Sequence, residues 1–240
     1  MRYLIVSDIH ANWQALEAVL ADAAGEYEQI LCCGDLVGYG ADPNRVIDWA
    51  RTSLTEVVRG NHDRAGAFDD DLEWFNPTAR RSAVWTRKTL TVENREWLKA
   101  LPSGPRAVAD FDLVHGSPLD EDEYLVRPDD FKDAFLHMFH RLAFFGHTHL
   151  QGAWSWDGGR HRPWESGASL DVRGNAAWLI NPGAVGQPRD LDPRAGYALF
   201  DVRLGEVHLK RVAYDVTAAR HAILAAGLPR SLGNRLIEGT

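Results

Sequence analysis

The chain has 240 residues, of which 45% are hydrophobic, so it can bury a large core, and we expect one α/β domain over residues 1–240. The net charge of −8 argues against stable nucleic-acid binding, because binding along phosphates needs many Lys and Arg side chains. No stretch approaches the roughly 20 apolar residues of a membrane span, and the first residues enter a predicted strand without a secretory signal. We expect a cytoplasmic protein with no membrane association, and a homo-oligomer is compatible with the sequence.

Five short apolar runs are typical of strands buried on both faces, and a polar motif directly follows each. The runs are residues 3–6, 30–33, 56–58, 111–114 and 142–145. The motifs, in the same order, are Ser7-Asp8-Ile9-His10, Gly34-Asp35, Gly60-Asn61-His62-Asp63, His115-Gly116 and Gly146-His147-Thr148-His149. Ligands and catalytic groups gather at the carboxyl ends of strands in parallel α/β sheets. We therefore expect the motifs to share one rim.

Helices are predicted where apolar residues recur every three or four positions. They cover residues 12–24, a segment opened by Asp42-Pro43, and residues 78–89, 93–101 and 128–140. Residues 65–76 lack this period and are predicted to form a surface loop near the rim. Cys32 and Cys33 are expected to be reduced thiols that point to opposite faces of a strand.

The last third of the chain favours further strands and a helical end. A hairpin is predicted from residues 154–156 and 160–164, and strands are predicted at residues 177–180, 196–202 and 206–212. One or two helices follow from residue 215, broken near Gly227-Leu228-Pro229. We expect this part to supply a second sheet rather than a separate domain.

The Asp, Asn and His side chains of the motifs suit metal ions. Carboxylate and neutral imidazole are ligands for zinc, manganese, iron or nickel, whereas calcium and magnesium sites are built mainly from oxygen. The set is too large for one tetrahedral ion and fits two ions that share a carboxylate. In an extended segment, residues i and i+2 point the same way, so Asp8 with His10, and His147 with His149, are expected to converge.

Together, the order Asp-x-His, Gly-Asp-x-x-Gly, Gly-Asn-His-Asp, His-Gly and Gly-His-x-His resembles that of the calcineurin-like metallophosphoesterases, especially their small prokaryotic phosphodiesterase branch. The motifs span residues 5–149, and Asn181-Pro182-Gly183-Ala184-Val185-Gly186 is similar to a late loop of that branch. The resemblance implies an α/β fold of two packed mixed β-sheets flanked by helices, a four-layer α/β/β/α sandwich.

The resemblance also implies a two-metal site. The implied ligands are Asp8, His10 and His149 for one ion, Asn61, His115 and His147 for the other, and Asp35 as the bridge. His62 would approach the substrate phosphate, and Asp63 would orient it.

Each residue also has an ordinary structural explanation when it is taken alone. The alternatives are a hydrogen-bonded loop residue for His115, a turn residue for Asp35, a left-handed loop position for Asn61, a solvated surface pair for His62 and Asp63, and a helix cap for Asp8. All of these alternatives would have to be true at once for the metal site to be absent, so we prefer the interpretation as a metal site.

The expected function is hydrolysis of a phosphate ester. The two ions would bind the phosphoryl oxygens and lower the pKa of a bridging water, whose hydroxide attacks phosphorus in line. His62 would stabilise the developing charge or protonate the leaving oxygen, and the sequence does not separate these roles.

The predicted substrate is a small phosphodiester. Near the motifs only Arg64 and Arg189 are predicted to bind substrate, and each could instead pair with a neighbouring Asp. With so few cations, a singly charged diester is preferred over a doubly charged monoester. The alternatives are a phosphomonoesterase of the same fold, acting on proteins or small molecules, and a non-catalytic metal-binding interaction module.

Overall fold

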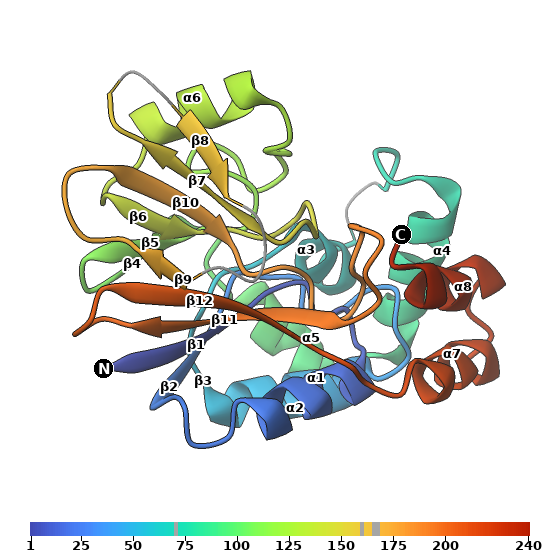
Figure 1. Cartoon of the computed structure of the whole chain (residues 1–240). Coiled ribbons are helices and arrows are strands. Elements are labelled where there is room, and N and C mark those ends of the chain that lie inside the picture. The colour runs from blue at the N-terminus through green and yellow to red at the C-terminus, as the bar shows by residue number, and fades with distance from the viewer. Residues whose placement is uncertain (70–71, 159–160, 165–168) are drawn as a thin grey trace.

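The computed structural model of the chain describes residues 1–69, 72–158, 161–164 and 169–240, and two mixed β-sheets pack face to face in it (Figure 1). The first sheet has the order β3-β2-β1-β11-β12-β9, built from β1 (Arg2–Val6), β2 (Gln29–Cys32), β3 (Leu54–Val57), β9 (Ser169–Asp171), β11 (Ala195–Asp201) and β12 (Glu206–Val212). The second has the order β4-β5-β6-β10-β7-β8, built from β4 (Arg106–Val108), β5 (Phe111–Leu113), β6 (Leu142–Phe144), β7 (Gly152–Trp156), β8 (His161–Trp164) and β10 (Ala177–Asn181).

Alternating side chains of the first sheet pack on its two faces. Leu4 of β1 packs toward Leu16 in the helical layer formed by α1 (Trp13–Asp22), α2 (Pro43–Ser53) and α5 (Val92–Lys99). Ile5 points the other way and belongs to the cluster between the sheets, together with Phe144 and Ile180 of the second sheet.

The outer face of the second sheet is covered by α6 (Pro128–Leu136), where the Phe131 ring stacks on Trp154 with centroids 4.1 Å apart. This gives the four-layer α/β/β/α arrangement that the resemblance implied.

The remaining helices gather beside the carboxyl end of β1 (Figure 1). They are α3 (Asn61–Ala67), α4 (Pro77–Thr89), α7 (Val216–Ala225) and α8 (Arg230–Glu238). Ile223 and Leu232 of the α7–α8 pair pack in one cluster with Ala79 of α4 and with Tyr39. No helix of the described chain is long and apolar enough to cross a membrane.

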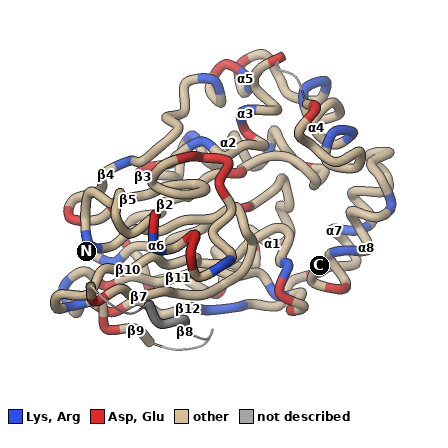
Figure 2. The backbone as a smooth tube through the Cα atoms, turned by 90° about the horizontal axis from the view of Figure 1, so that it is seen from above, with Lys and Arg blue, Asp and Glu red and all other residues tan. Residues whose placement is uncertain are grey.

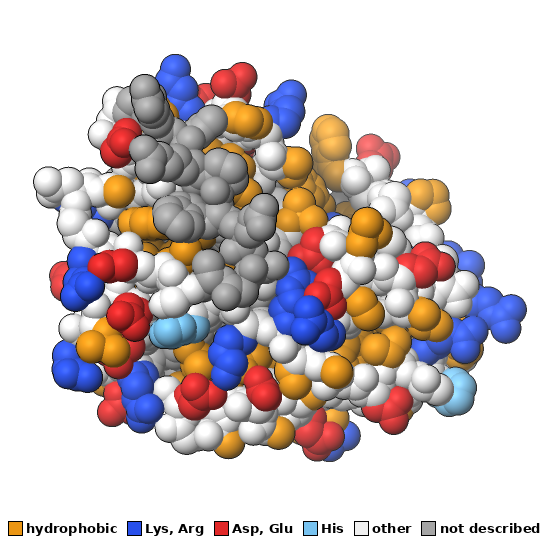
Figure 3. Space-filling view, in the orientation of Figure 1, with side chains coloured by type: hydrophobic (Ala, Val, Ile, Leu, Met, Phe, Trp, Pro, Cys, Tyr) orange, Lys and Arg blue, Asp and Glu red, His pale blue; other side chains and the backbone are white. Residues whose placement is uncertain are grey.

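Charged residues lie mainly in the helices and loops, and much of the two sheets is uncharged (Figure 2). On the face drawn in Figure 3, the visible Lys and Arg side chains alternate with Asp and Glu. The described residues on that face therefore form no broad basic surface.

Most predicted elements are present, and the two cysteines behave as expected. Both are buried free thiols, with Cys32 in the cluster beneath the helices and Cys33 in the cluster between the sheets. The turn predicted between β7 and β8 includes residues 159–160, which lie outside the described residues.

Two predictions of secondary structure were wrong, and two strands were not predicted. The helix predicted over residues 128–140 ends at Leu136, because the backbone N–H and ring Nδ1 of His140 bind the Asp112 carboxylate at 2.9 and 2.8 Å. The loop predicted over residues 65–76 begins only after Ala67, since α3 continues to that residue, and residues 70–71 of this prediction lie outside the described residues. The edge strands β4 and β9 were not predicted, because each has three mostly exposed residues and no apolar run.

Candidate metal centre

The five motifs follow strands of both sheets, namely β1, β2 and β3 of the first sheet and β5 and β6 of the second. We had predicted an extended backbone for the two i, i+2 pairs, but the backbone of these motifs is not extended. The φ angles are positive at Asp8 (53°), His10 (49°), Asp35 (56°), His147 (64°) and His149 (62°). Such angles are uncommon outside glycine and tend to cluster at functional sites. The side chains converge through left-handed turns instead.

The motif loops are fixed by hydrogen bonds to one another. The backbone N–H of Asp8 donates to Gly34 O at 3.0 Å, and that of His147 donates to the Asp8 carboxylate at 3.1 Å. The late loop also lies here, because the Gly186 N–H donates to Asp8 O at 2.9 Å. Gly186 approaches so closely that an added Cβ would lie 1.8 Å from Ile9 O. The positions of the ligand candidates thus depend on several loops at once.

The first ligand group brings two imidazole nitrogens face to face. The Nε2 atoms of His10 and His149 lie 3.1 Å apart, and Asp8 Oδ1 lies 3.4 Å from His149 Nε2. The Nδ1 of His10 lies 3.0 Å from Val37 O, and that of His149 contacts Gln187 O. A carbonyl oxygen only accepts hydrogen bonds, so each Nδ1 carries the hydrogen and each Nε2 presents a lone pair.

These distances match the spacing of ligands around one ion. Ligand atoms about 2.1 Å from a metal in tetrahedral geometry lie roughly 3.4 Å from each other. Two lone pairs that face each other repel, and a cation between them removes the repulsion. Asp8, His10, Asp35 and His149 could therefore hold a metal ion.

The second group contains His115 and His147, which with Asp35 could hold another ion. His115 Nδ1 lies 2.8 Å from Cys33 O, while its Nε2 lies 3.2 Å from Asn61 Oδ1. His147 Nε2 lies 3.1 Å from the backbone oxygen of Asp122. Because that carbonyl takes the Nε2 hydrogen, His147 presents Nδ1 as its lone pair.

Asp35 lies between the two groups. Its Oδ1 accepts the His62 N–H at 2.8 Å. Its Oδ2 is buried with no hydrogen-bond partner among the described residues, and it lies 3.6 Å from His10 Nε2 and 3.4 Å from His115 Nε2. A buried, unpaired carboxylate oxygen is costly, and a bound cation would satisfy it.

Burial and neighbouring charges set the protonation of these groups. Burial lowers the pKa of His10 and His149 well below the usual range, and burial with the nearby His115 lowers that of His147 to about 3. Burial opposes charge on His115, but the Asp35 carboxylate outweighs it and raises the pKa to about 10. The Asp35 pKa stays low despite burial because His115 and His62 are near. The raised pKa of His115 places positive charge near Asp35, but Asp35 Oδ2 still accepts no hydrogen bond among the described residues.

His62 is buried beside both groups. Its ring packs on Tyr39 and Phe75 with centroids 4.3 and 4.9 Å away, and burial lowers its pKa to about 4. The ring also lies close to Gly38, where an added Cβ would lie 2.5 Å from His62 Nδ1. The alternative of a solvated surface pair with Asp63 is wrong, because both side chains are buried.

Asp63, which we expected to orient His62, makes its hydrogen bonds to the loops around that residue. Its carboxylate accepts hydrogen bonds from the backbone N–H of Val37 and of Gly60, both at 3.1 Å, rather than from the His62 ring. It thereby joins the two loops that enclose His62, and burial raises its pKa to about 7.

The alternative of Asp8 as the cap of α1 is wrong, since the side chain of Asn12 rather than that of Asp8 accepts the Ala15 N–H.

The two predicted substrate-binding arginines differ. Arg64 pairs with Glu121 and, at 2.7 Å, with Asp122. Arg189 donates to the Tyr39 hydroxyl at 3.3 Å, and no carboxylate in the described chain lies within ion-pair distance of it. The alternative of an ion pair with a neighbouring Asp therefore holds for Arg64, through Asp122, and does not hold for Arg189.

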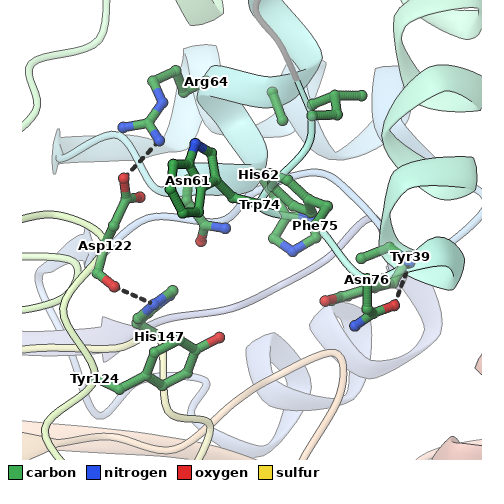
Figure 4. A pocket seen from close by; sticks show the side chains of 13 residues that line it. Tyr39, Asn61, His62, Arg64, Trp74, Phe75, Asn76, Asp122, Tyr124 and His147 are labelled. Atoms are coloured by element: carbon green, nitrogen blue, oxygen red, sulfur yellow. Dashed lines mark hydrogen bonds and ion pairs between the residues drawn. The ribbon is translucent and has the colours of Figure 1, made fainter.

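A pocket of about 380 Å³ opens beside the ligand groups (Figure 4). Asn61, His62 and His147 line one part of it, and aromatic side chains line another: Tyr39, Trp74, Phe75 and Tyr124. We did not predict these aromatic residues. Tyr39 lies only four positions after Asp35, so its closeness to a motif in the sequence could have indicated a place at the site. Trp74 and Tyr124 lie in segments without a motif.

Known proteins are similar to this chain in sequence and in fold. The model of the calcineurin-like phosphoesterase superfamily domain matches residues 1–205. An uncharacterized protein of Methanocaldococcus jannaschii is 36% identical over 245 residues, which cover 98% of this chain and 97% of that protein.

Solved structures agree with these matches. A metallophosphoesterase from Sphaerobacter thermophilus is 39% identical with a TM-score of 0.90, covering 100% of this chain and 99% of that one. A hypothetical protein from Pyrococcus horikoshii OT3 has the same fold at 21% identity and a TM-score of 0.79, covering 100% and 98%. The chain belongs to the calcineurin-like phosphoesterase superfamily.

Proposed function

We propose that this chain is a binuclear phosphoesterase that hydrolyses small phosphodiesters with two divalent transition metal ions. Manganese, iron, zinc and nickel all suit the ligand chemistry. The proposed ligands are Asp8, His10 and His149 for one ion, Asn61, His115 and His147 for the other, and Asp35 for both. Membership of a phosphoesterase superfamily supports the reaction class.

The observation that carries this proposal is the unpartnered Oδ2 of Asp35. It lies within 3.6 Å of imidazole nitrogens from both ligand groups. A single ion would satisfy the lone pairs of one group and leave the other group unpaired. Two ions that share Asp35 satisfy both.

Bound ions would supply Lewis acidity toward the phosphoryl oxygens and lower the pKa of a water molecule. The chain's own residues do the rest. His62 would contact the phosphoryl group, either stabilising the charge that develops or protonating the leaving oxygen. Gly38 and Asp63 would keep that ring in place, Gly38 by leaving room for it and Asp63 by joining the loops around it.

The preference for diesters rests on the available cations. The charge of Arg64 is compensated by two carboxylates, and Arg189 alone of the two has no such partner. One available cation beside the ions suits a singly charged diester better than a doubly charged monoester.

The test compares matched aryl phosphodiester and phosphomonoester substrates on manganese-loaded protein whose metal content is measured. The proposal expects two ions per chain and a higher kcat/KM for the diester. A higher value for the monoester would favour the phosphomonoesterase alternative. Two bound ions without hydrolysis of either ester would favour a non-catalytic module.

A further inference from the structure

The pocket continues from the candidate metal centre into an aromatic compartment. The Tyr124 ring lies on His147 with centroids 3.9 Å apart, and the Phe75 ring meets His62 edge-on at 4.9 Å. His147 and His62 of the candidate metal centre are therefore each in contact with an aromatic residue that forms one wall of this compartment. A group attached to a phosphate at the metal centre would enter between these walls.

Trp74 is the unexplained residue of this compartment. It lines the pocket, yet 96% of its surface is exposed, and Tyr124 is 49% exposed (Figure 4). The packing of the fold does not account for the position of an indole that is almost fully exposed. An aromatic ring offers a flat apolar face on which a planar group stacks favourably.

The polar groups of the compartment are hydrogen-bonding rather than cationic. Asn76 lines the pocket, and its Oδ1 already accepts the N–H groups of Thr78 and Ala79 at 3.1 and 3.0 Å. Its Nδ2 hydrogens are left as donors for a ligand. The nearby Arg64 is compensated by Glu121 and Asp122. These features suit a neutral planar ring with acceptor atoms on its edge better than an alkyl chain or a second phosphate.

We propose that this aromatic compartment binds the base of a nucleotide whose phosphate lies at the metal centre, with Trp74 as a stacking face. The proposal rests on the proposed function, because the metal centre is what holds the phosphate. It narrows the substrate class to nucleotide esters. The pocket volume of about 380 Å³ falls in the range of small-molecule sites.

The test is a binding measurement that does not need turnover. Ribose 5-phosphate carries a hydroxyl at C1 where adenosine monophosphate carries the base, so calorimetric titration of each into the manganese-loaded full chain measures what the base contributes to binding. We expect adenosine monophosphate to bind about tenfold more tightly or better, the size of one base stack. Trp74→Ala should remove most of that advantage and leave the affinity for ribose 5-phosphate unchanged, while Trp74→Phe should keep much of it.

The control variant is Phe139→Ala, which removes a 77% exposed aromatic residue that does not line the pocket. It should keep the full advantage of the base. Equal affinities of the wild type for the two ligands, or equal weakening of both by Trp74→Ala, would overturn the proposal.

Phenyl phosphate tests whether the compartment binds any aryl group. Binding as tight as that of adenosine monophosphate, with the same loss in Trp74→Ala, would overturn the assignment to a base. Failure of the proposed function looks different, because the chain would then hydrolyse no phosphate ester regardless of these affinities.

Discussion

The Nε2 atoms of His10 and His149 face each other at 3.1 Å with no hydrogen between them. Backbone carbonyls hold the Nδ1 hydrogens of both rings, so neither ring can turn its N–H toward the other without losing a hydrogen bond. Repulsion between these lone pairs adds to the cost of the unpaired Asp35 Oδ2. We therefore expect the metal-free protein to be less stable than the metal-bound protein.

Bound metal should therefore raise the melting temperature. At a free manganese concentration 100-fold above Kd, one site adds about 2.7 kcal/mol, which is on the order of 5–10 °C for a chain of this size. Thermal melts with manganese and with excess chelator measure the shift. His149→Ala should shrink it, because one facing nitrogen is lost. An unchanged melting temperature on chelation would contradict the metal assignment.

Asp35→Asn should weaken the binding of both ions, because among the described residues only Asp35 has a carboxylate within ion-pair distance of imidazoles in both ligand groups. Elemental analysis after dialysis against a manganese concentration that just saturates the wild type should give two ions per wild-type chain and fewer than one in the variant. Asp133→Asn, an exposed change on α6, serves as the control and should keep both ions. One ion in the metal-saturated wild type would refute the binuclear site.

His62→Ala should keep both metals and lose catalysis, because the proposed role of His62 acts on the transition state rather than on coordination. The expected loss in kcat is about 10²- to 10⁴-fold. Metal content and kcat are measured on the same preparation, with the exposed His208→Ala as control. Near-wild-type kcat with full metal content would remove His62 from the mechanism.

Gly38→Ala should impair catalysis through His62. The residue has φ +90°, and the new Cβ would lie 2.5 Å from His62 Nδ1. Gly25→Ala is a matched control, because Gly25 has φ +81° and nothing lies within 4 Å of its added Cβ. Both variants should lose about 1–2 kcal/mol from the left-handed backbone, but only Gly38→Ala should lower kcat. Equal kcat values in the two variants would show that Gly38 does not control the position of His62.

The parts of the fold that could be predicted are those with a local signal. The apolar runs that form β1 and β2 and the periodic stripe of α1 are such signals. The insertion of β11 beside β1 is not, because its register, with Leu4 opposite Leu199, joins distant parts of the chain. The end of α6 likewise depends on Asp112, a residue of another strand.

The same distinction applies to the site. The motif residues could be predicted because residue type and position after a strand are both visible in the sequence. The use of Asp63 could not, since its partners Val37 and Gly60 come near it only after two loops have folded. Trp74 carries no signal at all, because neither periodicity nor a motif marks an exposed ring at a pocket.

Arg189 and Arg64 should respond differently to mutation, and this tests the assignment of the substrate-binding cation. Arg189 has no carboxylate partner in the part of the chain that is described and donates to the Tyr39 hydroxyl at the pocket. A lost hydrogen bond to a charged phosphate costs about 1.5–3 kcal/mol, so Arg189→Ala should lower kcat/KM for the aryl diester roughly 10- to 100-fold.

Arg64→Ala is the matched comparison. Its charge is already compensated, and Glu121 keeps a second partner in Arg59 at 2.9 Å, so the loss should stay below about fivefold. Steady-state kinetics on the diester and the monoester, with metal content checked, measure both variants. A larger loss in Arg64→Ala would mean that substrate displaces the Glu121 and Asp122 carboxylates, and the pocket would then accept the second negative charge of a monoester.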